Sequence, residues 1–357
     1  MKEIIRATIA IIVVCALLFF VNDYLNKSSG NAGNDTVTIY NWGEYIDPEL
    51  IAQFEDESGY RVVYETFDSN EAMMTKIEQG GTSYDIAVPS EYAIEKMKEN
   101  NLLLPIDHSK IPNLENIDPY FLDLSFDPKN EFSIPYFWGT VGIVYNPTLL
   151  DGQTFDSWEA LWDSSLKGQI LLVDGAREVI GMGLNSLGYS LNSTNVSELQ
   201  EATDKLKKLT PNVKAIIGDE VTQLMVNEEA AVALTWSGQA ADMMWENEEL
   251  DYAVPQEGSN LWFDNMVIPK TAANIEGAHA FINFMLDVEV AAQNADYVGY
   301  STPNLAAVDI MDEEVTSDER FYPPEEQRDN LEVYNNLGLE MLGKYNELFL
   351  EFKMSAN

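Results

Sequence analysis

The chain is poor in the residues that most often bind metals or act as catalytic nucleophiles and bases. Its 357 residues include a single cysteine, Cys15, and only two histidines, His108 and His279. One cysteine excludes a disulfide within the chain, and two histidines leave no basis for a Cys- or His-based metal site or catalytic dyad. We therefore expect no metal, no cofactor and no enzymatic activity.

Basic residues are also scarce, with 20 Lys and Arg against 60 Asp and Glu, which gives a formal net charge of −40. Such a field repels nucleic acid and attracts cations, so we expect no nucleic-acid partner. The alternative interpretation is that the acids only keep an extracellular surface soluble. The length, with 46% hydrophobic residues, is sufficient for two ordinary domains, each with its own core.

Charged residues are absent from residues 7–21, which follow Lys2 and Arg6. With the residues up to Leu25, this run approaches the ~20 residues that a membrane-spanning helix needs. We predict that residues 1–25 form an uncleaved membrane anchor, with the rest of the chain outside. Residues 26–35 (NKSSGNAGND) then form a flexible linker. The alternative is a cleaved secretory signal. Lipid attachment at Cys15 is less well supported because the preceding Val14 is bulky.

Beyond residue 35, short β-type runs alternate with helical patterns. The predicted strands are residues 37–40, 61–66, 85–88, 169–173, 214–217, 231–236 and 262–269. The predicted helices are residues 47–59, 69–79, 176–187, 197–209, 219–227, 277–286, 288–297 and 332–352. This order predicts an α/β protein with a mostly parallel sheet and helices on both faces. No Pro-, Ser- or Gly-rich linker divides residues 36–352, which indicates domains joined by more than one crossing.

Trp262 and Asp264 are two residues apart in a predicted strand, so their side chains should point to the same face. An aromatic face beside a carboxylate suits an organic cation, which the ring attracts and the carboxylate hydrogen-bonds. The alternative is a strand with a buried Trp and a turn-capping Asp.

Similar clusters follow four other predicted strands and the predicted helix 288–297, and the ligands of open α/β sheets bind beyond the carboxyl ends of strands. They are Asn41-Trp42-Gly43-Glu44-Tyr45, Pro89-Ser90-Glu91-Tyr92, residues 174–178, Trp236-Ser237-Gly238 and residues 298–304. Each cluster also has a structural interpretation: Trp42 in the core, Glu44 on the surface, Asp174 as a helix N-cap. Their shared position favours a ligand with methylene groups for the rings and ammonium groups for the carboxylates.

At these residues the chain resembles the spermidine/putrescine-binding proteins of polyamine ABC importers, the PotD family. The resemblance runs from about residue 36 to residue 352. Its most specific parts are YNWGEY at 40–45, FDP at 126–128, SIPYFWG at 133–139, DGARE at 174–178, WFD at 262–264 and GYSTPN at 299–304.

The resemblance implies a two-lobed type II periplasmic-binding-protein fold with the ligand cleft between the lobes. It implies a first lobe of residues 36–139 plus 264–308 and a second of residues 140–263 plus 309–357. It also implies a monomer that delivers a polyamine, spermidine or putrescine, to the permease and ATPase subunits of an ABC transporter. The closed, ligand-bound state would be the one that docks on the permease.

The resemblance also implies the ligand contacts. The methylene chain would lie between Trp42, Tyr45, Tyr92, Trp236, Trp262 and Tyr300. The ammonium groups would meet Glu44, Glu178 and Asp264, and Ser90 would add a hydrogen bond. Three positions depart from the family pattern: Gly43 replaces a hydroxyl residue, Gly175 replaces an acid beside Asp174, and Tyr334 replaces a Gln. These departures affect the choice between polyamines.

Two other functions are compatible with the same residue types. A glycosidase would place two carboxyl groups across a groove, about 5–9.5 Å apart, and nothing in the sequence fixes such a pair. The second function is that of a binding protein for a sugar or for Fe³⁺. An iron site would need clustered Tyr oxygens and acids without stacking Trp residues.

Overall fold

The computed structural model describes residues 35–218 and 220–356. The predicted membrane segment 1–25 and nearly all of the predicted linker lie outside the described residues. Among the helices that the structure describes, none is long and apolar enough to cross a membrane.

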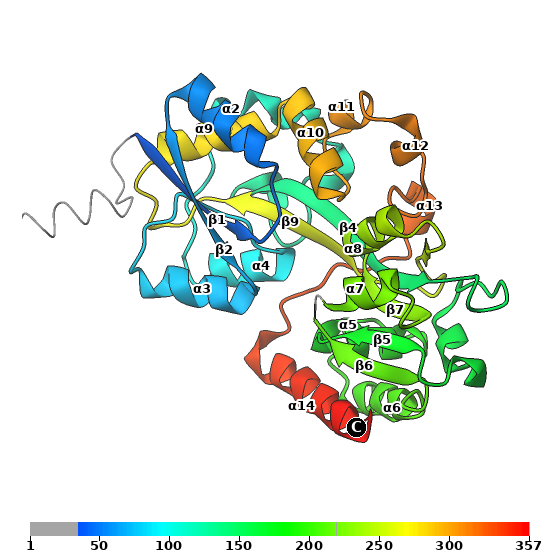
Figure 1. Cartoon of the computed structure of the whole chain (residues 1–357). Helices are drawn as coiled ribbons and strands as arrows, with labels where there is room; N and C mark the ends of the chain where they lie inside the picture. Colours follow the sequence, from blue (N-terminus) through cyan, green and yellow to red (C-terminus); the bar gives the residue numbers. More distant parts are fainter. Residues whose placement is uncertain (1–34, 219, 357) are drawn as a thin grey trace, which may run out of the picture.

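Two α/β lobes share one continuous sheet (Figure 1). The strands of the first lobe are β1 (Thr36–Trp42), β2 (Arg61–Phe67) and β3 (Ile86–Ala87). Those of the second are β5 (Ile170–Val173), β6 (Val213–Ile217), β7 (Val232–Trp236) and β8 (Asp251–Ala253). The strands β4 (Ser133–Tyr145) and β9 (Leu261–Val267) join them. The order is β2-β1-β3-β9-β4-β7-β5-β6, and β8 pairs with the edge of β4 beyond the end of β9.

Helices cover both faces of the sheet, as predicted. In the first lobe, α2 (Pro48–Ser58) and α9 (Ile275–Met285) cover one face, and α3 (Asn70–Gln79) and α4 (Glu91–Glu99) the other (Figure 1). The helix α10 (Val288–Val298) completes this lobe. The second lobe holds α5 (Ala176–Asn185), α6 (Val196–Lys207), α7 (Glu220–Val226), α8 (Ser237–Glu246) and the C-terminal α14 (Gly338–Ala356).

Local sequence signals set the helix ends. The Asp47 side chain accepts a hydrogen bond from Glu49 N, and Pro48 occupies the first turn of α2. Gly59, at φ 77°, ends α2 in the left-handed region, and Gly299 ends α10 in the same way. Leu50 and Phe54 of α2 are buried, and Phe54 packs edge-on against Phe281 of α9.

The prediction of a mostly parallel sheet is wrong. The pairs β1–β2, β1–β3, β5–β6 and β5–β7 are parallel, but β9 is antiparallel to β3 and β4, and β4 is antiparallel to β7 and β8. The reason is β4, a fully buried 13-residue strand that was not predicted. Its first part pairs with β9 as far as Thr140, and from Val141 onward it pairs with β7. The chain therefore passes between the lobes inside a single strand.

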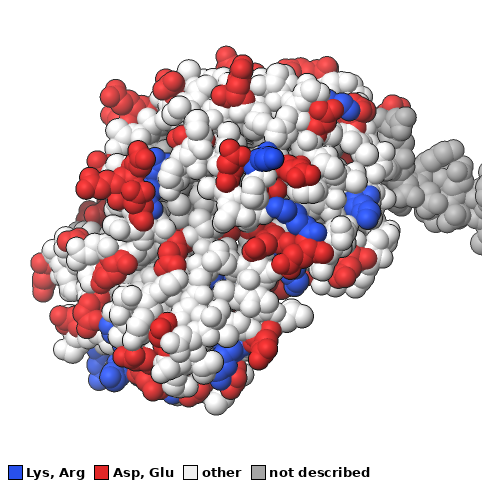
Figure 2. Space-filling model, turned by 180° about the vertical axis from the view of Figure 1, so that it is seen from behind, with Lys and Arg blue, Asp and Glu red and all other residues white. Residues whose placement is uncertain are grey.

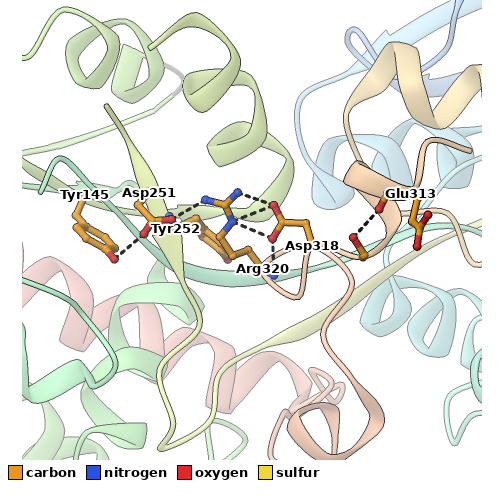
Figure 3. Close-up of polar contacts among 7 residues, drawn as sticks. Tyr145, Asp251, Tyr252, Glu313, Asp318 and Arg320 are labelled. Atoms are coloured by element: carbon orange, nitrogen blue, oxygen red, sulfur yellow. Dashed lines mark hydrogen bonds and ion pairs between the residues drawn. The ribbon is translucent and has the colours of Figure 1, made fainter. Parts of the chain in front are cut away.

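The chain returns to the first lobe through β9, and a third passage follows α10, through α11 (Leu305–Val308), α12 (Glu313–Thr316) and α13 (Glu325–Arg328). Figure 3 shows how this segment is attached to the second lobe. Arg320 Nη1 lies 2.7 Å from Asp251 Oδ1, and Tyr145 Oη donates to Asp251 Oδ2 at 2.9 Å. The Arg320 Nε–H donates to both Asp318 oxygens, which holds the guanidinium in place. Phe321 stacks on Tyr252 with ring centroids 5.8 Å apart.

Candidate functional site

Asp264 is the centre of the site because it is a buried carboxylate held from two directions. It lies in the middle of β9 and is 6% exposed. Tyr45 Oη donates to its Oδ2 and Ser90 Oγ donates to its Oδ1, each at 2.7 Å. Burial raises the pKa of Asp264 to about 6, although the two hydrogen bonds lower it. The alternative interpretation of Asp264 as a turn cap is wrong, because the residue lies within a strand.

Aromatic rings surround Asp264 in edge-to-face contacts. The Tyr300 ring lies 5.2 Å from Trp262 and 5.4 Å from Tyr45, at interplanar angles of 83° and 72°. Tyr45 also packs against Phe137, with centroids 5.2 Å apart. Aromatic faces carry partial negative charge and attract cations, so rings grouped around a carboxylate suit an organic cation.

Two glycines allow the rings to approach the backbone. A Cβ at Gly139 would lie 2.5 Å from Trp262 Cζ2, and a Cβ at Gly238 would overlap the Tyr300 ring. Gly238 belongs to α8 of the second lobe, whereas Tyr300 follows α10 of the first. The Tyr300–Gly238 contact therefore joins the two lobes directly beside Asp264.

The second lobe contributes Trp236 at the end of β7 and Glu178 in the first turn of α5, both half-buried. Burial raises the pKa of Glu178, while the Arg177 guanidinium lowers it and Glu71 of α3 raises it. A Cβ at Gly175 would lie 2.1 Å from Glu178 Oε2, so a side chain there would require the Glu178 carboxylate to move.

Asp174 is exposed, and its Oδ1 lies 2.7 Å from Lys353 Nζ of α14. Its interpretation as a helix N-cap is wrong, because Gly175 occupies that position and makes no side-chain cap bond. Gly43 and Glu44 are also exposed, and Glu44 adopts a left-handed φ of 49°. The binding roles of Gly43, Glu44 and Asp174 stay predictions.

Three other predicted residues lie beside these groups. Trp42 is half-buried, and its ring packs against Phe67 at 4.5 Å. Asn70 Nδ2 donates to Tyr92 Oη at 3.0 Å and to Ser90 Oγ at 3.1 Å. Tyr334 is buried beneath the Arg177 guanidinium, 4.1 Å from its ring centroid. The structure therefore brings Tyr45, Ser90, Trp262, Asp264 and Tyr300 into mutual contact through bonds and rings.

Two charged residues of this region, Glu91 and Arg177, belong to the predicted clusters but were assigned no role of their own. Glu91 is 0% exposed, and its Oε2 accepts a hydrogen bond from Phe263 N, between Trp262 and Asp264, at 3.1 Å. Burial raises the pKa of Glu91 to about 8; the Phe263 N–H and Arg177 lower it, and Asp264 raises it. In the sequence, only their positions point to the site: Glu91 lies between Ser90 and Tyr92, and Arg177 precedes Glu178.

Several buried polar atoms of this region have no hydrogen-bond partner within residues 35–218 and 220–356. They are Trp42 Nε1, Glu91 Oε1, Arg177 Nε and Trp262 Nε1. Buried polar atoms are normally paired, so such a concentration marks a place where water or a ligand completes the bonding. Among the same residues, no three His, Cys, Asp or Glu side chains gather in a way that could hold a metal ion.

The raised carboxyl pKa values predict a stability that depends on pH. Folding raises the pKa of Glu91 from 4.5 to about 8 and that of Asp264 from 3.8 to about 6. At a pH between the unfolded and the folded pKa of each group, the folded protein binds protons that the unfolded chain does not. The free energy of unfolding therefore falls as pH rises through that range. We expect the ligand-free protein to lose roughly a few kcal/mol between pH 5 and pH 8. Thermal unfolding at the two pH values measures the loss.

A Glu91→Gln variant isolates the contribution of Glu91 from that of the overall negative charge. We expect the difference in unfolding temperature between pH 5 and pH 8 to shrink by several degrees in this variant. Glu78→Gln, which removes an exposed acid from α3, should keep the full difference. Equal differences in the two variants would contradict the assignment of the effect to Glu91.

Comparison with known proteins gives one family and a consistent set of relatives. The family model for bacterial extracellular solute-binding proteins matches residues 49–323. The chain is 41% identical over 316 residues to the spermidine/putrescine-binding periplasmic protein of Escherichia coli (strain K12), covering 88% of this chain and 91% of that protein.

Two solved structures are similar over nearly their whole length. One, from Listeria monocytogenes, is assigned to a spermidine/putrescine ABC transporter; it is 66% identical, with a TM-score of 0.84, and the match covers 90% of this chain and 99% of that chain. The other is the spermidine/putrescine ABC transporter substrate-binding protein PotD of Streptococcus pneumoniae. It is 58% identical, with a TM-score of 0.85, and the match covers 90% of this chain and 100% of that chain.

Proposed function

Because this chain belongs to the family of bacterial extracellular solute-binding proteins, we propose that it captures linear polyamines, spermidine or putrescine, and delivers them to an ABC importer. The similar proteins named above bind spermidine and putrescine or belong to their transporters. The chain is a transport component and not an enzyme. The observation that carries the proposal is the buried Asp264, fixed by Tyr45 and Ser90 and surrounded by ring edges.

The chemistry of the site matches that ligand. An aliphatic ammonium group has a pKa near 10.4, so it enters the site charged. Burying it without a partner would cost several kcal/mol, so we expect a carboxylate partner for each nitrogen. Asp264 and Glu178 meet the ammonium groups in our proposal, and the faces of Trp42, Trp236, Trp262 and Tyr300 pack against the methylene groups.

Binding works by closure of the two lobes around the amine. We keep the predicted first lobe, residues 36–139 plus 264–308, and second lobe, residues 140–263 plus 309–357. Contacts of one ligand with both lobes stabilise the closed state, so the amine shifts the equilibrium between open and closed forms. Acidic side chains outnumber basic ones on the face seen in Figure 2, which favours the approach of a cation.

The protein works outside the cytoplasm, where its relatives bind their solutes. The uncharged residues 7–21 support an N-terminal anchor that holds a monomer at the outer face of the membrane. A closed, ligand-loaded monomer then docks on the permease, and the ATPase subunits power uptake.

A fluorescence titration tests this function. The chain has 7 Trp residues, and three of them, Trp42, Trp236 and Trp262, lie at the site, so ligand binding should change the emission. We expect saturable changes with spermidine or putrescine and none with maltose or ferric ion. A response to maltose or ferric ion with none to either amine would refute the proposal.

A further inference from the structure

Three acids of α4, four residues apart, point toward the second lobe. Glu95 Oε2 accepts from Asn336 N at 2.9 Å, and Glu99 Oε2 accepts from Asn336 Nδ2 at 3.2 Å. Asn336 belongs to the tail that packs on the second lobe, since the adjacent Asn335 carbonyl accepts from Arg177 Nη1. Glu91 is the third acid of this row, because positions i, i+4 and i+8 share one face of a helix.

Glu91 differs from the other two because it is fully buried, including the oxygen that is not bonded. Its Oε2 is bonded to Phe263 N, but its Oε1 is buried without a partner among the described residues. Arg177 of α5 likewise has one buried polar group without a partner among the described residues, but this group is a donor. Its Nη2 donates to Asn192 Oδ1 at 2.8 Å and its Nη1 to Asn335 O, whereas its Nε–H is buried and unbonded within the described part of the chain.

Glu91 and Arg177 are neighbours across the boundary between the lobes. The Arg177 guanidinium lowers the pKa of Glu91. Both groups also shift the pKa of Tyr334, which lies beneath Arg177: Glu91 raises it and Arg177 lowers it. The tail links the two groups geometrically, because Glu95 and Glu99 of the same row as Glu91 bond Asn336, and Arg177 bonds the adjacent Asn335. Leaving Glu91 Oε1 or Arg177 Nε–H buried and unbonded costs about 1–3 kcal/mol, and more for a charge.

We propose that Glu91 and Arg177 are the two halves of an interlobe ion pair that forms when the lobes close on the ligand. The inference rests on the proposed function, because the amine drives the closure. Ser90, the residue before Glu91, donates to Asp264, and Glu91 itself is bonded between Trp262 and Asp264. An ammonium group at Asp264 therefore lies close to the Glu91 carboxyl.

Formation of the pair releases a proton. In the ligand-free protein the Glu91 carboxyl is largely neutral at pH 7, since its pKa is about 8. The ionisable groups that face it are Asp264 from β9, Arg177 from α5, Tyr334 from the tail and the adjacent Tyr92. When the ammonium and the guanidinium approach, the Glu91 O–H bond breaks, the proton passes to the solvent, and the carboxylate bonds to Arg177 Nε–H.

Titration calorimetry with spermidine at pH 8, in two buffers of different ionisation enthalpy, measures this proton. At pH 8 Glu91 is about half protonated and Asp264, with a pKa of about 6, is ionised. We expect release of about half a proton per amine from the wild type and from Glu78→Gln, and none from Glu91→Gln. Glu91→Gln and Arg177→Gln should each weaken spermidine binding more than fivefold, and the double variant should bind no more weakly than the weaker single variant.

Each outcome decides the proposal. Amine binding with equal proton release from the wild type and from Glu91→Gln would overturn the interlobe pair and leave the proposed function intact. The interlobe pair would also be overturned if the losses of affinity from the two substitutions multiplied in the double variant. A wild-type protein that bound no amine would overturn both. If Arg177→Gln fails to fold, the proton release of Glu91→Gln still gives the answer.

Discussion

Replacing Asp264 with Asn is expected to weaken spermidine binding by more than tenfold, which corresponds to at least about 1.4 kcal/mol. The substitution keeps the shape of the side chain and an acceptor for Tyr45 or Ser90 but removes the charge that faces the ammonium group. A buried cation without its partner carries most of its desolvation cost unrelieved. Titration calorimetry on purified protein measures the change.

A matched control separates this local effect from the loss of one negative charge overall. Asp56 lies on the exposed side of α2, and Asp56→Asn should leave the affinity unchanged. Unaltered spermidine affinity in Asp264→Asn would refute the role of this carboxylate as the central contact.

Replacing Gly238 with Ala is expected to weaken spermidine binding between tenfold and a hundredfold without unfolding the protein. The new Cβ would overlap the Tyr300 ring, which is held by Tyr45 and Trp262 and has little room to move. This contact is present in the ligand-free structure, at the junction of the two lobes, so the substitution changes how the lobes fit together around the ligand. Overpacking of this kind typically costs about 1–3 kcal/mol. Calorimetry with spermidine gives the affinity, and thermal unfolding of the ligand-free variant tests its stability.

Gly343→Ala is the control, because a Cβ at Gly343 of α14 would meet nothing within 4 Å. It should bind spermidine as the wild type does. If Gly238→Ala bound spermidine with wild-type affinity, the contact between Tyr300 and Gly238 would have no part in ligand binding.

The helices and parallel strands could be predicted because their signals are local. Asp47 with Pro48 begins α2 and Gly59 ends it, and the observed bounds follow those signals. The strand β4 could not be placed in this way. Its 13 residues are buried throughout, so no alternation of polar and apolar residues marks it, and its two halves serve different lobes. The mixed sheet follows from that strand and was missed with it.

The site was predictable where chemistry and strand ends coincide. Trp262 and Asp264 are two residues apart in a strand, and the structure places their partners Tyr300, Tyr45 and Ser90 around them. The burial of Glu91 and Arg177 was not predicted, because a charged residue in a helix usually indicates a solvated face. Their burial depends on how α4 and α5 meet across the lobes, which no local pattern encodes.

A crystal structure of the protein grown with spermidine tests the central claim most directly. We predict that the amine lies between the two lobes, with one nitrogen within hydrogen-bond distance of Asp264 and its methylene groups against Trp236 and Trp262. An amine bound elsewhere on the surface, or Trp42, Trp236 and Asp264 on separate surfaces that share no cleft, would contradict it.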